Sequence, residues 1–218
     1  MDERRLARHV AGATTAHDGL LAMLDELIAV EELDVEAPSR LPGWTIGHVL
    51  THLARNADSI TRVLSAAERG DVVDRYEGGG PGRDAEIEAG RGRPAAEQVA
   101  DVRRSIAWLE QQWSAQVRWD GRSRETVGHE IPVSDLPFMR WREVEVHRAD
   151  LGVGYEPADW PSGYVREELL TMEMRWNARR PMGLTGLPEA ALRQPPHVRL
   201  AWLLGRTTID GLEPAGVF

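Results

Sequence analysis

The fold of this chain is decided by the segment Leu41-Pro42-Gly43-Trp44-Thr45-Ile46-Gly47-His48-Val49-Leu50-Thr51-His52-Leu53-Ala54. Pro42 and Gly43 end a loop, and Thr45 is a suitable N-cap for a helix that runs to about residue 69. The apolar residues of this helix recur at three- and four-residue spacing, which is typical of a helix with one buried face; they are Val49, Leu50, Leu53, Ala57, Ile60, Leu64 and Ala67. His52 lies on this apolar side, so we expect its imidazole to point into a helical core.

Further helices are predicted on both sides of this segment. They cover residues 2–32, 94–117, 135–151, 162–180 and 197–204. Residues 71–93 contain Gly78-Gly79-Gly80-Pro81-Gly82 and many charges, which indicates a mobile surface loop. Thr126–Val127 and Ile131–Val133 are expected to form short extended pieces. The sequence therefore predicts a mainly α protein, with a four-helix bundle over residues 1–155 and a short helical and irregular extension over residues 156–218.

Composition limits the classes of function that fit this chain. It has 218 residues, 42% apolar and 28% charged, which suits one globular domain with an appendage. The net charge of −9, without a basic stripe, argues against nucleic acid as a partner. No apolar run approaches the roughly 20 residues that span a bilayer, and the N-terminal residues lack the apolar stretch of a signal peptide. We therefore expect a cytoplasmic protein that does not bind membranes.

Two residue types are missing, and each absence excludes a chemistry. The chain contains no cysteine, so a thiolate metal site, a disulfide and a cysteine nucleophile are all excluded. Any thiol chemistry must use a thiol brought in from outside. All 26 basic residues are arginine, so a Schiff base on lysine is excluded as well. Arginine does supply a forked set of donors for carboxylates where it faces a pocket.

A second segment, Arg142-Glu143-Val144-Glu145-Val146-His147-Arg148-Ala149-Asp150-Leu151-Gly152, offers metal-ligand side chains one helical turn apart. Glu143 and His147 are related by i,i+4 and so lie on one helix face. His52 could supply a third ligand from a neighbouring helix. Two histidines and one carboxylate with open positions are typical of a catalytic metal site. The alternative is an exposed pair of Glu143 and His147, worth only about a few tenths of a kcal/mol.

The neighbours of these residues have roles that the sequence leaves partly open. Glu145 points away from His147 around the helix and is expected to be a solvated charge. Asp150 could hold the far ring nitrogen of His147, or form a salt bridge at the helix end. His48 could point into the bundle or make a surface or loop contact. The remaining histidines lack partners at helical spacing and are interpreted as structural; they are His9, His17, His129 and His197.

Together, these two segments resemble the mycothiol-dependent maleylpyruvate isomerase family, which has a DinB-like metal-binding four-helix bundle. The resemblance covers roughly residues 1–155. It implies that His52, Glu143 and His147 are ligands of a divalent metal, usually zinc, with water in the open positions. The segment Leu200-Ala201-Trp202-Leu203-Leu204-Gly205-Arg206 resembles the C-terminal helix of the family, which makes Arg206 the expected functional arginine.

The resemblance also implies a reaction. Mycothiol would supply the thiol that the chain lacks, and the thiolate would add to the activated double bond of maleylpyruvate. Rotation and loss of the thiol then give the trans isomer. Arg206 or another arginine would bind a carboxylate of this small electrophilic substrate. Two alternatives stay open: a mycothiol S-transferase acting on another electrophile, and a bundle that binds metal without catalysis. The sequence does not indicate an oligomeric state.

Overall fold

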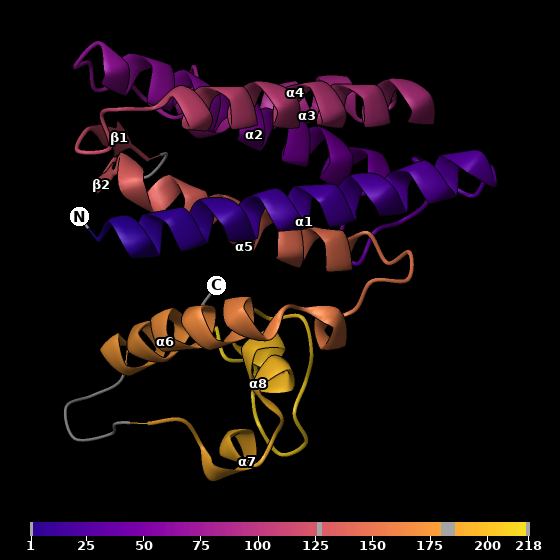
Figure 1. The fold of residues 1–218 in the computed structure, drawn as a ribbon. Coiled ribbons are helices and arrows are strands. Elements are labelled where there is room, and N and C mark those ends of the chain that lie inside the picture. The colour runs from indigo at the N-terminus through magenta and orange to yellow at the C-terminus, as the bar shows by residue number, and fades with distance from the viewer. Residues whose placement is uncertain (1, 126–127, 180–185, 217–218) are drawn as a thin grey trace. The chain divides into compact units, whose positions relative to one another are not determined.

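The structure, a computed structural model, describes residues 2–125, 128–179 and 186–216, and it is mainly helical (Figure 1). The mainly α fold class predicted from the sequence is confirmed. The chain divides into two compact units, Met1–Val153 and Gly154–Phe218, which are described separately. No helix within the described ranges has both the length and the apolar character needed to cross a bilayer.

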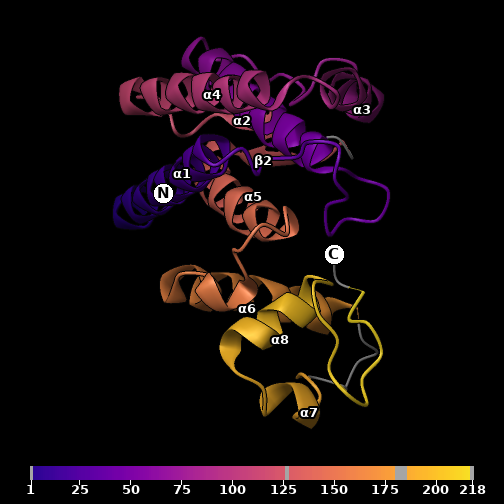
Figure 2. The ribbon, with the colours of Figure 1, turned by 90° about the vertical axis from the view of Figure 1, so that its right-hand side faces the viewer.

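Four long helices form a bundle in the first unit. They are α1 (Glu3–Ala29), α2 (Ile46–Glu68), α4 (Ala95–Ala115) and α5 (Leu136–Asp150), and each lies within the range predicted for it. Helix α1 packs along α5, and α2 packs along α4 (Figures 1 and 2). Contacts of α1 with α4 and of α2 with α5 close the bundle. The second and fourth predicted helices are therefore neighbours, as a shared site requires.

Local capping residues set where α1 and α2 begin. The Asp2 side chain accepts hydrogen bonds from the backbone N–H groups of Arg4 and Arg5. Thr45 and His48 form a capping box, in which the Thr45 side chain accepts from the His48 N–H and His48 Nδ1 accepts from the Thr45 N–H. These bonds satisfy amide groups that have no partner inside the helix. Thr45 is thus the N-cap that the sequence predicts, and it sets where α2 begins.

The core of the first unit is apolar and is shared by all four bundle helices. Every residue of the predicted apolar stripe of α2 is buried. The largest fully buried apolar side chains of these four helices are Leu20 and Leu24 of α1, Leu50, Leu53, Ile60 and Leu64 of α2, Leu109 of α4 and Leu136 of α5. Burial of each such side chain contributes about 1.5–3 kcal/mol relative to exposure. This packing holds α2 and α5 in a fixed relation.

The prediction of a mobile loop for residues 71–93 is wrong. These residues include a helix, α3 (Gly79–Gly90), which packs on α2. Only Ile87 and Gly90 of this helix are buried, so it leaves no apolar periodicity in the sequence. Small residues let α3 approach α2 closely. A Cβ at Gly47 would collide with the carbonyl oxygen of Arg91, and one at Gly90 would lie 2.6 Å from Thr51 Cγ2. Helix α3 therefore lies against the part of α2 that carries His52.

A short hairpin lies between α4 and α5. Strands β1 (Arg122–Arg124) and β2 (Glu130–Pro132) pair antiparallel, with Ser123 opposite Ile131. The extended piece predicted for residues 131–133 overlaps β2, and a 3-10 turn, η1 (Val133–Asp135), leads into α5. The piece predicted for Thr126–Val127 lies outside the described residues.

The second unit contains η2 (Pro157–Asp159), α6 (Ser162–Ala178), α7 (Glu189–Leu192) and α8 (Pro196–Leu203). Helices α6 and α8 pack on each other, and the rings of Trp176 and Trp202 lie 5.1 Å apart between them. The sequence predicts α6 and α8, but it gives no signal for α7, which is a single turn. Aromatic packing of this kind explains part of the high tryptophan content.

Candidate metal centre

Helices α2 and α5 bring His52, Glu143 and His147 to one point of the bundle. His52 Nε2 lies 2.8 Å from Glu143 Oε2, and His147 Nε2 lies 3.5 Å from the same oxygen. One ligand atom from each side chain lies within 4.8 Å of the others, and the described residues contain no other such group of three. The structure thus brings together all three predicted ligands, two from one helix and one from a segment about ninety residues away.

The donor set fits a divalent metal ion. Ligand atoms at about 2.1 Å from a tetrahedral zinc lie about 3.4 Å from each other. The distances of 2.8 Å and 3.5 Å around Glu143 Oε2 lie on either side of this value. Glu143 and His147 keep 20% and 14% of their side-chain surface exposed, while His52 keeps 4%. An ion at this point would therefore be shielded by the protein beside His52, and solvent or a substrate could reach it beside Glu143 and His147.

Asp150 fixes the orientation of His147. Its Oδ2 lies 2.9 Å from His147 Nδ1, and its side chain is 1% exposed. Of the two roles open to Asp150 in the sequence, the structure shows the contact with the far ring nitrogen. A carboxylate at Nδ1 keeps the proton on that nitrogen and leaves Nε2 free to bind a metal.

The charges of the three side chains are set by burial and by their mutual hydrogen bonds. Burial lowers the pKa of His52 to about 4, so its imidazole is neutral at neutral pH. Burial alone would raise the pKa of Glu143, but hydrogen bonds from His147 and His52 hold it well below its usual range. Burial opposes the charged form of His147 as well, yet its bonds to Asp150 and Glu143 raise its pKa. The site thus carries an ionised carboxylate between two imidazoles.

Trp44 lies beside His52 and His48 at the start of α2. The Trp44 ring lies 5.7 Å from the His52 ring and 5.8 Å from the His48 ring. His48 is buried, and besides its capping bond to Thr45 its Nε2 lies 3.3 Å from Glu88. His48 is therefore occupied as a helix cap and stands apart from the metal-ligand group. Trp44 supplies an apolar wall beside His52.

A buried arginine ties α5 to its neighbours one turn before Glu143. Arg140 has no exposed surface; its Nε donates to His17 Nε2 at 2.9 Å, and its Nη1 donates to the Leu53 carbonyl and to Asn56. Burial lowers the pKa of His17 to about 4, which keeps the ring neutral and able to accept. The network links α1, α2 and α5, and it fixes the rotation of α5 that presents Glu143 to His52.

Arg83 of α3 completes the surroundings of His52, and sequence reasoning missed it. Its Nη2 lies 3.1 Å from His52 Nδ1, and its guanidinium carbon lies 6.0 Å from the Tyr76 ring. The segment around it is rich in glycine and charge, and no spacing relates Arg83 to the ligand motifs. No feature of the sequence pattern could have indicated this contact.

Comparisons with known proteins show the family to which this chain belongs. A family model described as the mycothiol maleylpyruvate isomerase N-terminal domain matches residues 13–152, which is more than half of the chain. The chain belongs to this family. Among solved structures, the crystal structure of the mycothiol-dependent maleylpyruvate isomerase is similar at 22% identity and a TM-score of 0.80, over 93% of this chain and 90% of that chain. A mutant of the same enzyme matches at 21% identity, with the same TM-score and coverage. No curated protein matches the sequence.

The match to these structures also bears out the DinB-like helical fold expected from the family resemblance. At this level of identity it concerns the fold alone. The family match covers α2 and α5, and thus both segments that supply the three candidate ligands. The family match therefore includes the part of the chain that carries the His52, Glu143 and His147 group.

The prediction that Glu145 is a solvated charge is wrong. Its side chain is 2% exposed and accepts a hydrogen bond from Trp141 Nε1 at 3.0 Å. Helix α5 is covered on more than one side, so a residue that points away from His147 still points into the protein. Trp141, one turn earlier, supplies the donor that a buried carboxylate requires.

Arg206 lies in the second unit, directly after α8. It is partly buried, its N–H bonds to the Ala201 carbonyl, and its Nη1 donates to the Leu204 carbonyl at 2.6 Å. These bonds hold the arginine against the end of α8. The expected catalytic role of Arg206 stays a prediction.

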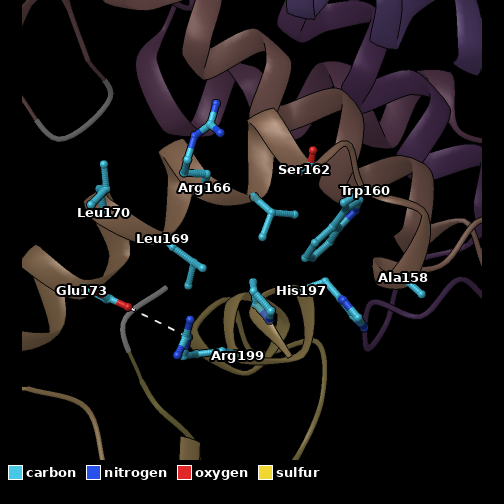
Figure 3. Close-up of a pocket in the computed structure, with 11 residues that line it drawn as sticks. Ala158, Trp160, Ser162, Arg166, Leu169, Leu170, Glu173, His197 and Arg199 are labelled. Carbon is cyan, nitrogen blue, oxygen red and sulfur yellow. Dashed lines mark ion pairs between the residues drawn. The ribbon is translucent and has the colours of Figure 1, made fainter. Parts of the chain in front are cut away.

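A separate cavity of about 660 Å³ lies between α6 and α8 in the second unit (Figure 3). Trp160, Val165 and Leu169 form apolar walls, and Arg199 and Glu173 make a long ion pair of 4.0 Å at one side. Arg166 points away from the centre of this cavity (Figure 3). The residues that line the cavity include neither Arg206 nor any member of the His52, Glu143 and His147 group.

Proposed function

We propose that this protein is a metal-dependent isomerase that uses mycothiol to convert a conjugated cis diacid, most simply maleylpyruvate, into its trans isomer. The observation that carries the proposal is the meeting of His52, Glu143 and His147 at one point, in a chain of the mycothiol maleylpyruvate isomerase family. The solved structure that this chain resembles is that of a mycothiol-dependent maleylpyruvate isomerase, which supports the same reaction.

His52, Glu143 and His147 would hold the metal ion. Two imidazole nitrogens and one carboxylate oxygen favour zinc among the common divalent ions. The bound ion would supply positive charge that lowers the pKa of a thiol and stabilises negative charge on the substrate. Three protein ligands leave positions open for other molecules, which distinguishes a catalytic site from a structural one.

The chain's own side chains prepare this site in three ways. Burial keeps His52 neutral, so metal binding at Nε2 needs only a shift of the ring proton to Nδ1 and no removal of a second proton. Asp150 orients the ring of His147 through Nδ1. Trp44 covers the side of His52 and limits the access of water there. Of these contacts, the one with Asp150 reduces the rearrangement that metal binding at His147 would require.

The absence of cysteine supports an external thiol as co-substrate. The proposed reaction is reversible addition of that thiol to the double bond, which becomes a single bond about which the diacid rotates before the thiol leaves. Because the chain carries a net charge of −9, a dianionic substrate requires arginine near the site. We propose Arg206 as one residue that binds a substrate carboxylate, on the basis of the family resemblance.

The test is to incubate the zinc-loaded protein with mycothiol and maleylpyruvate and to follow both the diacid and the thiol. Formation of the trans diacid with full recovery of free thiol supports the isomerase. A stable thioether, on this diacid or on other electrophiles, would instead indicate a mycothiol S-transferase. Absence of any reaction, with metal still bound, would indicate a bundle that binds metal without catalysis.

Variants connect this activity to the proposed ligands. His52→Ala and Glu143→Ala should each lose bound metal and isomerase activity together. Glu145→Gln is the matched control, because it alters a buried carboxylate of the same helix that contacts Trp141 rather than the ligand group. Equal metal content in all three variants would overturn the assignment of the ligands.

A further inference from the structure

The two imidazoles of the candidate metal centre have opposite partners at their Nδ1 atoms. His147 Nδ1 faces a carboxylate, Asp150 Oδ2 at 2.9 Å. His52 Nδ1 faces a guanidinium, Arg83 Nη2 at 3.1 Å. A carboxylate behind a metal-bound histidine is the usual arrangement, because it accepts the proton that the ring carries on the nitrogen away from the metal. The partner of His52 has the opposite character.

A guanidinium can only donate hydrogen bonds, and this fixes the tautomer of His52 in the structure. Nδ1 must accept from Arg83, so the ring proton of the neutral imidazole lies on Nε2. Nε2 then donates to Glu143 Oε2 at 2.8 Å. A metal ion at Nε2 requires that nitrogen to be free of its proton, and the neutral ring then carries the proton on Nδ1. Two N–H donors would face each other, so the contact between His52 and Arg83 cannot persist in this form.

Arg83 is held in a way that allows it to leave His52. Its side chain is 26% exposed, and its Nη1 pairs with Asp84, whose side chain is 70% exposed. Such a surface ion pair contributes little to stability. The Tyr76 ring offers a surface on which the guanidinium can remain near the site. The change of partner therefore involves one side chain at the edge of the site and leaves the packing of α3 unchanged.

We propose that Arg83 holds His52 only in the metal-free protein, is released when a divalent metal binds at Nε2, and then binds a carboxylate of the diacid substrate beside the metal. The freed guanidinium offers two parallel N–H donors, which is the geometry that carboxylates accept. The part of this proposal that concerns the substrate rests on the proposed function, whereas the release of Arg83 on metal binding does not.

The first test measures metal binding without thiol or substrate. Zinc affinity of the full chain is measured by competition with a chromophoric chelator for the wild type, Arg83→Gln and Arg91→Gln. Arg91→Gln removes the same charge from the end of the same helix, at a side chain that pairs with Glu88. Arg83→Gln should bind zinc about three- to tenfold more tightly, the range expected for one hydrogen bond that metal binding must otherwise break. The zinc affinity of Arg91→Gln should equal that of the wild type.

The tautomer of His52 supplies a readout that a purely structural role would not change. In the metal-free wild type, nitrogen-15 NMR of the histidine rings should show the His52 proton on Nε2, and addition of zinc should move it to Nδ1. Unchanged or weaker zinc binding by Arg83→Gln, or a proton on Nδ1 in the metal-free protein, would overturn the proposed release.

The second test measures binding of a nonreactive diacid, maleate, to the zinc-loaded proteins by calorimetry. Arg83→Gln should weaken maleate binding about tenfold, and Arg83→Lys should weaken it less because a point charge remains without the fork. Equal maleate affinity in the wild type and in Arg83→Gln would overturn the carboxylate-binding role. Both tests avoid turnover, so an inactive protein that passes them would refute the proposed isomerase function and leave the role of Arg83 intact.

Discussion

Replacement of Asp150 by asparagine should weaken metal binding and leave the bundle folded. The Asp150 carboxylate accepts the Nδ1 proton of His147 at 2.9 Å and is 1% exposed, so water cannot take its place. Asparagine has nearly the same shape and keeps one acceptor oxygen, but it lacks the negative charge. The variant therefore removes the electrostatic part of the contact and preserves most of the packing.

The size of the effect follows from this geometry. Loss of a buried partner of a metal-bound histidine typically weakens metal affinity 10- to 100-fold, or about 1.4–2.8 kcal/mol. Because asparagine keeps an acceptor at Nδ1, Asp150→Asn should lie near the lower end, at about tenfold. Asp150→Ala leaves the Nδ1 proton without a partner and should lie near the upper end.

The assay is competition for zinc with a chromophoric chelator, together with a chemical denaturation curve for each metal-free variant. Glu145→Gln is the control, since Glu145 is a buried carboxylate of α5 that contacts Trp141 instead of His147. Its zinc affinity should equal that of the wild type, even where its stability falls. The reasoning is refuted if both Asp150 variants bind zinc as tightly as the wild type, or if Glu145→Gln loses as much affinity as they do.

Three further predictions concern pH and packing. Because the pKa of His147 is raised, metal must displace a proton there, and zinc affinity should fall about tenfold per pH unit below that pKa, as seen in chelator competition. The pKa of His17 is about 4 in the folded protein and 6.5 in the unfolded chain, so the unfolded chain takes up a proton at a higher pH. The free energy of unfolding should therefore decrease by about 2 kcal/mol as the pH is lowered from about 7.5 to 5. Denaturation curves of His17→Gln should lack this decrease. Gly47→Ala should lower the free energy of unfolding by about 1–3 kcal/mol, because the new methyl group meets the Arg91 carbonyl. The opposite exchange in the same helix, Ala54→Gly, should lower it by only about 1 kcal/mol, because it introduces no collision.

The bundle helices could be predicted from the sequence because their signals are local. Apolar residues at three- and four-residue spacing mark α2, and Thr45 marks its start. The same is true of Glu143 and His147, whose proximity follows from one turn of a helix. Helix α3 lacks such a signal, since it buries only Ile87 and Gly90 and its glycines resemble those of a loop.

The environment of each charged side chain was harder to predict. Glu145 points away from His147, as the helix geometry requires, but the direction that sequence alone associates with solvent is filled by packed side chains around α5. Arg140 and His17 look ordinary in the sequence, yet they form the buried network that links three helices. In each case the surroundings come from segments distant along the chain.

By itself, the sequence determined the helices of the bundle, the pairing of Glu143 with His147, and the fact that any thiol in the reaction would have to come from outside the chain. These follow from periodicity, one-turn spacing and the absence of cysteine, which are properties of the chain before it folds. Only the tertiary structure decided that His52 reaches the same point and that Asp150 and Arg83 stand behind the two imidazoles. The physical reason is that a hydrogen-bond partner from another helix depends on how the helices pack, and that packing is fixed by the whole core.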